Sequence, residues 1–313
     1  MSYIIGSFNL RDFNFSNRSS DGEDEEIKRD FDKIAQIIID EKFDVVALQE
    51  LNAPLPLKFL TSVLNRSKNY SRAYECIFGT DMPNQSGSKD PERYGFIWNT
   101  KRLRLLKTRR NSNPGYYENA GAIGLIRPPY YARFTARGML GGANFELRLV
   151  NTHIRNAREE IRIVEFNVLV RQVLPRICDH QEISEDGEIM PAYTFLLGDY
   201  NLVLNKSERS IYKIETVTTT NYTGKTRSFM TAQEEETSLG LPKDQTSIEE
   251  CYANNYDHFT YETDLDRKLI LTPQRVEALG KYFFESPSAS DKLSKYRQNV
   301  SDHVPIRLTV DLK

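Results

Sequence analysis

Short apolar runs recur along the chain, and their length and composition are typical of buried β-strands. Residues 3–8, 43–48 and 193–197 are runs of this kind. Between the first two, apolar residues recur at helical spacing from Ile27 to about Lys42. This order of strand, helix and strand predicts a structure built from layers of helices and sheets.

The same patterns continue through the middle and the end of the chain. Residues 131–137 and 145–150 alternate well enough to predict a hairpin around Gly141-Gly142. Residues 161–177 form the clearest amphipathic helix, whereas residues 218–247 are polar and aperiodic and predict long loops. The remaining elements that we predict are a helix at 57–64 and strands at 74–78, 94–98, 103–106, 256–261 and 304–310.

Composition narrows the class of protein. With 313 residues and 39% hydrophobic content, the chain can bury a sizeable core, and without repeats or linkers we expect a single domain spanning residues 1–313. A net charge of −2 argues against a protein that coats DNA non-specifically, but not against an enzyme with a locally basic cleft. No apolar stretch is long enough to span a membrane, and residues 3–8 already read as a strand, so we expect no membrane association and a cytoplasmic location.

Chemically competent side chains stand where the predicted strands end. Each one has a structural explanation when taken singly, such as a capped turn or a surface carboxylate. Strand ends converge on one edge of a sheet, however, so we expect these residues to meet in one cleft. A histidine beside a carboxylate suits proton transfer or metal binding near neutral pH. The residues are Asn9, Glu50, His153, Asp199, Asn201, Asp302 and His303.

Five of these segments occur in the order found in one known superfamily. The chain resembles the endonuclease/exonuclease/phosphatase superfamily, and most of all its deoxyribonuclease I-like branch. The resemblance implies an α+β fold, a four-layer α/β/β/α sandwich in which two packed, mostly antiparallel sheets are flanked by helices. The matching segments are Phe8-Asn9-Leu10-Arg11, Leu48-Gln49-Glu50, Asn151-Thr152-His153, Gly198-Asp199-Tyr200-Asn201 and Ser301-Asp302-His303.

The resemblance also implies catalytic pairs. Glu92 lies in a segment that resembles the one whose glutamate orients the first catalytic histidine, which would be His153. Asp257 lies in a segment that resembles the late strand whose aspartate orients the second histidine, which would be His303. The residues expected to position water or the phosphoryl group are Asp199 and Asn201.

Metal and phosphate ligands follow from the same set. Oxygen ligands suit a hard cation, so we expect Mg²⁺ or Mn²⁺ as the cofactor. The expected metal ligands are Glu50, Asn9, Asp302 and Asp199. The family resemblance further implies that Arg127 and Arg11 bind the substrate phosphate, together with Asn201.

One departure from the family bears on the cellular compartment. The deoxyribonucleases of this family carry a cysteine soon after the glycine-aspartate motif, whereas residues 202–204 here contain none, so Cys251 lacks that partner. Together with Cys76 and Cys178, this cysteine predicts neither a disulfide framework nor a zinc site. The absent disulfide fits a reducing compartment.

Together these features predict a divalent-metal-dependent phosphodiester hydrolase, most simply an endonuclease whose partner is DNA and which has no obligate protein partner. The alternative is a phosphomonoesterase or a sphingomyelinase-like lipid phosphodiesterase. A lipid hydrolase would expose an apolar loop, for which the aromatic residues 114–117 are a candidate. A third reading, a catalytically inactive binding module, is disfavoured because the acids and histidines are all retained.

Overall fold

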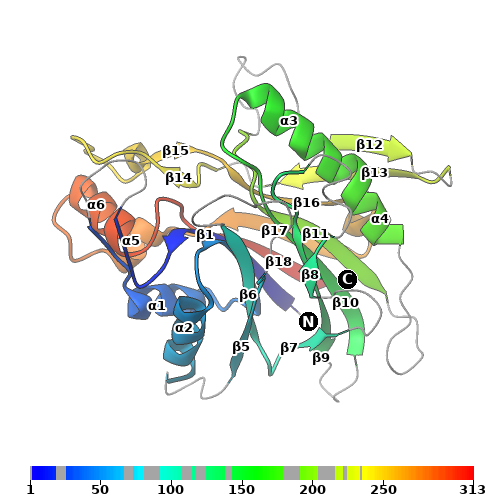
Figure 1. The fold of residues 1–313 in the computed structure, drawn as a ribbon, viewed down its shortest axis with the longest axis horizontal. Coiled ribbons are helices and arrows are strands. Elements are labelled where there is room, and N and C mark those ends of the chain that lie inside the picture. Colours follow the sequence, from blue (N-terminus) through cyan, green and yellow to red (C-terminus); the bar gives the residue numbers. More distant parts are fainter. Residues whose placement is uncertain are drawn as a thin grey trace.

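The computed structural model describes residues 2–18, 26–66, 73–80, 92–107, 114–117, 125–137, 143–179, 191–203, 216–220, 224–232 and 235–313. Two large sheets dominate this part of the chain (Figure 1). In the first sheet, β1 and β4 run parallel and the other neighbouring strands run antiparallel. Its strands are, in order, β17 (Leu269–Arg275), β18 (Ile306–Leu312), β1 (Ser2–Phe13), β4 (Val45–Leu51), β6 (Arg93–Asn99) and β5 (Tyr74–Phe78).

The second sheet has one parallel pair, β10 with β11, among otherwise antiparallel neighbours. Its strands are, in order, β12 (Thr216–Thr220), β13 (Thr226–Ala232), β16 (Asp257–Glu262), β11 (Ala192–Asp199), β10 (Ala143–His153), β9 (Tyr130–Arg137) and β7 (Leu103–Leu106), with β8 (Gly115–Tyr116) also paired to β9. Two short pairs complete the strands: β14 (Ser238–Leu239) with β15 (Tyr252–Asn254), and β2 (Ser16–Arg18) with β3 (Glu26–Lys28).

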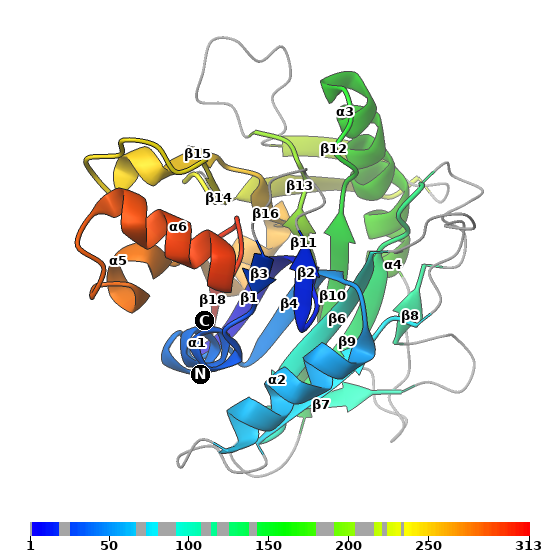
Figure 2. The same cartoon turned by 60° about the vertical axis from the view of Figure 1, so that its left-hand side comes forward.

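Helices cover the outer face of each sheet (Figure 2). The first sheet is covered by α1 (Phe31–Asp40), α2 (Pro54–Arg66), α5 (Ala278–Tyr282) and α6 (Ala289–Asn299). The second is covered by α3 (Glu159–Val168) and α4 (Leu174–Asp179), which a π-helical turn at Leu169–Val173 joins. The predicted four-layer sandwich with two mostly antiparallel sheets is therefore confirmed.

The two-residue period of the strands determines where the core and the site lie. In β1, Tyr3 and Ile5 face the core between the sheets, whereas Phe8 and Leu10 face the helices. The inward row of β1 therefore continues into the polar Ser7 and Asn9. The inward rows of three other strands also run from apolar to polar residues. In β4, Val45 and Ala47 are followed by Gln49; in β10, Leu147 and Leu149 by Asn151 and His153; and in β11, Phe195 and Leu197 by Asp199.

A buried amide layer separates this apolar core from the cleft. The side-chain nitrogen of Gln49 donates to the Ser7 hydroxyl at 3.1 Å and to the Asn151 side-chain oxygen at 2.7 Å. Asn151 in turn donates to the backbone oxygens of Leu48 and Gly95. These bonds join strands from both sheets, so the layer fixes how the sheets sit against each other just below the site.

Several predicted elements differ from the structure. Ile27 lies in β3, and α1 begins only at Phe31, because the Asp30 side chain accepts the Lys33 N–H and caps the helix there. Residues 218–247 were predicted as long loops, but their described part also contains the end of β12 and the whole of β13 and β14. The helices predicted at 57–64 and 161–177 are present, and β9 pairs with β10 as predicted, although the turn at Gly141-Gly142 lies outside the described residues.

Candidate active site

Three adjacent strands of the second sheet place acidic and imidazole groups in one row, at the end of the sheet where β10 and β11 end and β16 begins. His153 ends β10 opposite Asp199, which ends β11, and Asp199 in turn lies opposite Asp257, which begins β16. All three side chains follow the inward-facing row of their strand. The row therefore points toward the first sheet, at the end where polar residues replace the apolar core.

Glycine is required beside this row. Gly198 has φ +144°, and a Cβ there would lie 1.8 Å from the backbone oxygen of Thr152 on the neighbouring strand. No other residue fits this conformation without opening the β10–β11 ladder. The glycine therefore lets the Asp199 backbone pair closely with that of His153.

The backbone at the site is strained at four positions. Arg11, Asp12, Glu50 and Asn201 have φ values of 39°, 48°, 57° and 49°, in the left-handed region that residues other than glycine rarely adopt. Each such residue costs about 1–3 kcal/mol and persists only where its surroundings hold it. At Glu50 the strain coincides with a register shift between β4 and β6, which breaks the alternation and turns the carboxylate into the cleft.

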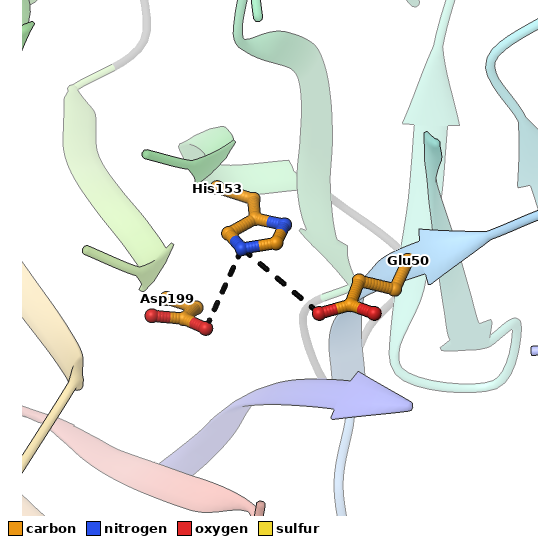
Figure 3. Close-up of side chains that lie close together, drawn as sticks. All are labelled: Glu50, His153 and Asp199. Atoms are coloured by element: carbon orange, nitrogen blue, oxygen red, sulfur yellow. Dashed lines mark ion pairs between the residues drawn. The ribbon is translucent and has the colours of Figure 1, made fainter. Parts of the chain in front are cut away.

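Glu50, His153 and Asp199 form a compact group whose candidate ligand atoms all lie within 4.8 Å of one another (Figure 3). The His153 Nε2 atom is 3.6 Å from Asp199 Oδ2 and 3.9 Å from Glu50 Oε1. The Asn9 side-chain nitrogen donates to Glu50 at 2.7 Å and to Asp199 at 3.0 Å. Asn9 thus holds the two carboxylates together, while its amide oxygen accepts the Arg11 N–H.

His153 lies between a carboxylate and a guanidinium. Its Nδ1 atom is 2.9 Å from Glu92 Oε2, and Arg127 bridges the pair, donating to Glu92 Oε1 at 2.8 Å with its other terminal nitrogen 3.1 Å from Nδ1. Asn201 Nδ2 lies 3.2 Å from Nε2. Burial lowers the pKa of His153, but the carboxylates of Glu92 and Asp199 together outweigh burial and raise this pKa above its ordinary value. The structure thus brings His153 next to Glu92, its predicted partner, and next to Arg127 and Asn201, two of the residues predicted to bind phosphate.

His303 forms the second pair. Its Nδ1 atom is 2.7 Å from Oδ2 of the fully buried Asp257, and its Nε2 atom is 3.7 Å from Asp199 Oδ2. Burial opposes the imidazolium, but Asp257 and Asp199 outweigh it and hold the pKa of His303 well above its ordinary value. The Asp199 carboxylate therefore lies between both histidines. His303 itself stands before β18, in a bridge with Ser238.

Arg11 and Asp302 lie beside the three-residue group rather than in it. Their side chains pair at 3.4 Å, and both line the cleft. Asp302 is therefore placed to influence the group through its charge, whereas Glu50 and Asp199 are the predicted oxygen ligands that the structure brings next to each other.

The cleft has a volume of about 510 Å³. Besides charged residues, the cleft is lined by neutral residues from the β14–β15 region, including Leu239, Leu241 and Tyr256. Asn9 and Asp257 do not line the cleft themselves, but they bind side chains that do. The predicted residues that line it are Arg11, Glu50, Glu92, Arg127, His153, Asp199, Asn201, Asp302 and His303.

Buried negative charge at the group makes it receptive to a cation. Burial, together with the neighbouring Glu92 carboxylate, raises the pKa of Glu50 to about 7. Burial also raises the pKa of Asp199, although both histidines oppose this. The two carboxylates are oxygen donors of the kind that suits Mg²⁺ or Mn²⁺, so the residues present fit a divalent ion.

Two supporting residues were not predicted to have a role. The Tyr94 hydroxyl accepts the backbone N–H of His153 at 3.0 Å. The Ser301 hydroxyl donates to the Asn9 backbone oxygen at 2.7 Å and accepts the His303 N–H at 3.2 Å, which ties β1 to the His303 segment. Ser301 stands within a recognised motif, whereas no sequence pattern singles out Tyr94.

None of the helices in the described part of the chain is both long and apolar enough to cross a bilayer. The aromatic candidate loop at residues 114–117 is half-buried, and Tyr116 packs on the rings of Tyr94 and Tyr130. These residues therefore do not form the exposed apolar loop that a lipid hydrolase would be expected to have.

The four layers and the cleft between them define a class of protein. Solved structures of endonuclease/exonuclease/phosphatase proteins match the chain over nearly its full length, and the chain has their fold. One, from Bacteroides thetaiotaomicron, is 15% identical with a TM-score of 0.54, and the match covers 100% of this chain and 98% of that one.

Two further matches carry names that describe an activity or a ligand. D. rerio TDP2 complexed with a single strand DNA product is 16% identical, with 99% of each chain covered and a TM-score of 0.52. A mannosyl-6-phosphatase from Bacteroides thetaiotaomicron is 14% identical, with 98% of this chain and 99% of that chain covered and a TM-score of 0.52. No family model matches the chain, and no curated protein matches it in sequence.

Proposed function

We propose that the protein is a divalent-metal-dependent phosphodiester hydrolase and that its substrate is DNA, which it cleaves as an endonuclease. The observation that carries the proposal is the group of Glu50, His153 and Asp199, flanked by two histidine–carboxylate pairs. A phosphodiester resists attack because its anionic oxygens repel a nucleophile. Hydrolysis therefore needs a deprotonated water, neutralised phosphoryl oxygens and a stabilised leaving oxygen.

The proposed metal ligands are Glu50 and Asp199, with His153 within reach and Asn9 holding both carboxylates in place. A bound Mg²⁺ or Mn²⁺ ion would supply positive charge to the phosphoryl oxygens and to the leaving oxygen. Asp302 would add to the negative potential that attracts the ion.

Proton transfer falls to the two histidines. One accepts a proton from the attacking water as the new P–O bond forms, and the other donates a proton to the leaving alkoxide as the old P–O bond breaks. We assign the first role to His303 in its neutral form, oriented by Asp257, and the second to protonated His153, oriented by Glu92. In its protonated form, which the raised pKa favours, His303 would instead bind the phosphate. Asp199 and Asn201 would position the water or the phosphoryl group.

Phosphate binding is assigned to Arg127, Arg11 and Asn201, all of which line the cleft. The Arg127 guanidinium contacts Glu92 and His153. A phosphate held beside His153 would therefore lie next to this guanidinium. A guanidinium can donate to two phosphate oxygens at once, which favours it over lysine for this task.

A phosphomonoesterase is the second candidate. It is favoured by one observation, the match to a structure named as a mannosyl-6-phosphatase. DNA is favoured by the match to TDP2 with a single strand DNA product. The two substrates place different demands on the site. A phosphomonoester carries one more negative charge than a diester, and only one of its phosphate oxygens is esterified.

The test is hydrolysis of bis(p-nitrophenyl) phosphate and p-nitrophenyl phosphate with Mg²⁺, with Mn²⁺ and with EDTA. The proposal predicts metal-dependent cleavage of the diester in preference to the monoester, and loss of this cleavage in His303→Ala. Preference for the monoester would favour the second candidate. No hydrolysis of either ester by the folded, metal-supplied protein would overturn both.

We also propose a reducing, cytoplasmic setting. Cys76, Cys178 and Cys251 are all free thiols, and Cys178 and Cys251 lie in different parts of the fold. Secreted proteins of oxidising compartments more often join their cysteines. Labelling of thiols in freshly lysed cells tests this point, because oxidised cysteines would fail to react.

A further inference from the structure

Arg29 is a buried guanidinium that the proposed chemistry does not use. It lies between β3 and α1 and is only 7% exposed. Burial lowers its pKa to about 10, so it remains charged near neutral pH. A buried arginine of this kind is expected to have a specific structural task, because desolvating its charge is costly.

The donors of Arg29 are directed at backbone carbonyls on two different segments of the site. One terminal nitrogen donates to the Val300 oxygen at 2.8 Å, and the other donates to the Arg11 oxygen. Val300 immediately precedes Ser301, Asp302 and His303. One planar side chain therefore connects the end of β1 to the segment that carries the second histidine.

The neighbouring residue strengthens this connection. The Asp30 N–H donates to the Asn299 oxygen at 2.7 Å, so two consecutive residues bind the end of α6. β3 and α6 also lie side by side (Figure 2). A backbone bond thus supports the Arg29 side chain in holding this segment against the end of α6.

The carbonyl that Arg29 holds belongs to a strained turn. Arg11 and Asp12 both have positive φ, and their amide groups are already bound, the first by the Asn9 side chain and the second by Glu50. Those two partners belong to the proposed metal-binding region. Arg29 supplies the contact from outside it, on the carbonyl side of the same turn.

We propose that Arg29 is a positioning residue, which aligns Arg11 and the Asp302–His303 segment by holding one backbone carbonyl of each. Its effect on catalysis rests on the proposed function, because it acts through residues assigned to phosphate binding and proton transfer. The Arg11–Asp302 ion pair at 3.4 Å is the contact that this alignment produces.

The test uses Arg29→Met, which keeps the approximate length of the side chain and removes its donors, and Arg29→Lys, which keeps the charge. A matched control is Arg102→Met. Arg102 also donates to a backbone carbonyl, that of Ser2, and pairs with Asp44 at 2.9 Å, but at the other end of β1 and outside the cleft.

Diester hydrolysis per folded molecule should fall by about 100-fold in Arg29→Met, with a lower kcat and a higher KM, because small misplacements of reacting groups cost this much. Arg102→Met should lose stability without changing kcat or KM. Arg29→Lys should recover stability but not activity, since an ammonium group cannot hold both carbonyls in the geometry of a fork. Full activity in Arg29→Lys, or equal kinetic effects in both methionine variants, would overturn the proposal.

Amide hydrogen exchange separates this inference from the proposed function. If the wild-type protein hydrolyses no phosphoester, the proposed function fails, and exchange still decides the role of Arg29. Arg29→Lys should speed exchange at residues 9–12 and 299–304, whereas Arg102→Met should speed it near Ser2. Unchanged exchange in both site segments, or faster exchange throughout the chain, would refute a positioning role.

Discussion

Glu50→Gln should make the metal-free protein more stable at alkaline pH while impairing its activity. The Glu50 side chain is 17% exposed and lies among other carboxylates, and burial raises its pKa from 4.5 to about 7. When folding raises the pKa of an acid, the protein loses stability as the pH rises from the pKa of the unfolded state to that of the folded state. The loss begins above about pH 4.5 and is complete above about pH 7.

The size of this effect follows from the pKa difference. One pKa unit corresponds to about 1.4 kcal/mol of free energy. The charged Glu50 therefore lowers the free energy of unfolding by about 3 kcal/mol at pH 8. Glutamine carries no charge and keeps an oxygen that can accept from Asn9, but its amide nitrogen cannot accept the Asp12 N–H, which costs about 1 kcal/mol at every pH. Urea unfolding in EDTA should therefore show Glu50→Gln to be more stable than wild type by up to about 2 kcal/mol at pH 8 and less stable by about 1 kcal/mol at pH 4.

Glu41→Gln is the matched control. Glu41 is also buried, but Lys281 at 2.6 Å and Tyr282 at 2.9 Å bind its carboxylate, and although burial opposes them these partners lower its pKa. Its replacement should therefore destabilise the protein at pH 8. Adding Mg²⁺ should stabilise wild type more than Glu50→Gln, because only wild type retains both carboxylate ligands. A Glu50→Gln variant that is less stable than wild type in EDTA at pH 8 would refute this reasoning.

Three further predictions concern the site and its scaffold. His303→Ala and Asp199→Ala should each lower kcat by about 100-fold or more without unfolding the protein, and near-wild-type turnover in either variant would remove its assigned role. Gly198→Ala should destabilise the fold by more than about 3 kcal/mol, because the new Cβ would meet a backbone oxygen at 1.8 Å; a loss below about 1 kcal/mol in urea unfolding would contradict the backbone described here. Arg133→Met should cost about 3 kcal/mol at pH 7, since Arg133 binds Glu146 through two bonds of 2.6 Å in the core. Burial opposes the charged form of Glu146, yet its arginine partners lower its pKa, so this cost should shrink as the pH falls below about 4, and a pH-independent difference would argue against the ion pair.

Much of the fold and of the site could be predicted because one pattern determines both. The alternation that places Tyr3, Ile5, Leu147 and Leu149 in the core continues directly into Asn9 and His153. A strand that ends in a polar residue on its inward row therefore reveals the site as well as the strand. The partners Glu92 and Asp257 needed the family resemblance, because nothing in their local sequence points to a histidine far along the chain.

Other features could not be read from the sequence because long-range contacts determine them. The threonine-rich strand β12 has alternating exposure but little apolar content, so it reads as a loop until its pairing with β13 is known. Glu50 faces the cleft only because a register shift interrupts β4. Arg29 resembles any arginine before a helix cap, and its two carbonyl partners lie 18 and 271 positions away.

Cleavage of supercoiled plasmid by the purified protein is the direct test of whether the protein is a metal-dependent DNA endonuclease. With Mg²⁺ or Mn²⁺ we expect conversion to the nicked form, and we expect none in EDTA or with His303→Ala. That result would establish a metal-dependent DNA endonuclease whose activity depends on this site. Intact plasmid after incubation with the folded, metal-supplied wild-type protein, or equal nicking by His303→Ala, would contradict the account.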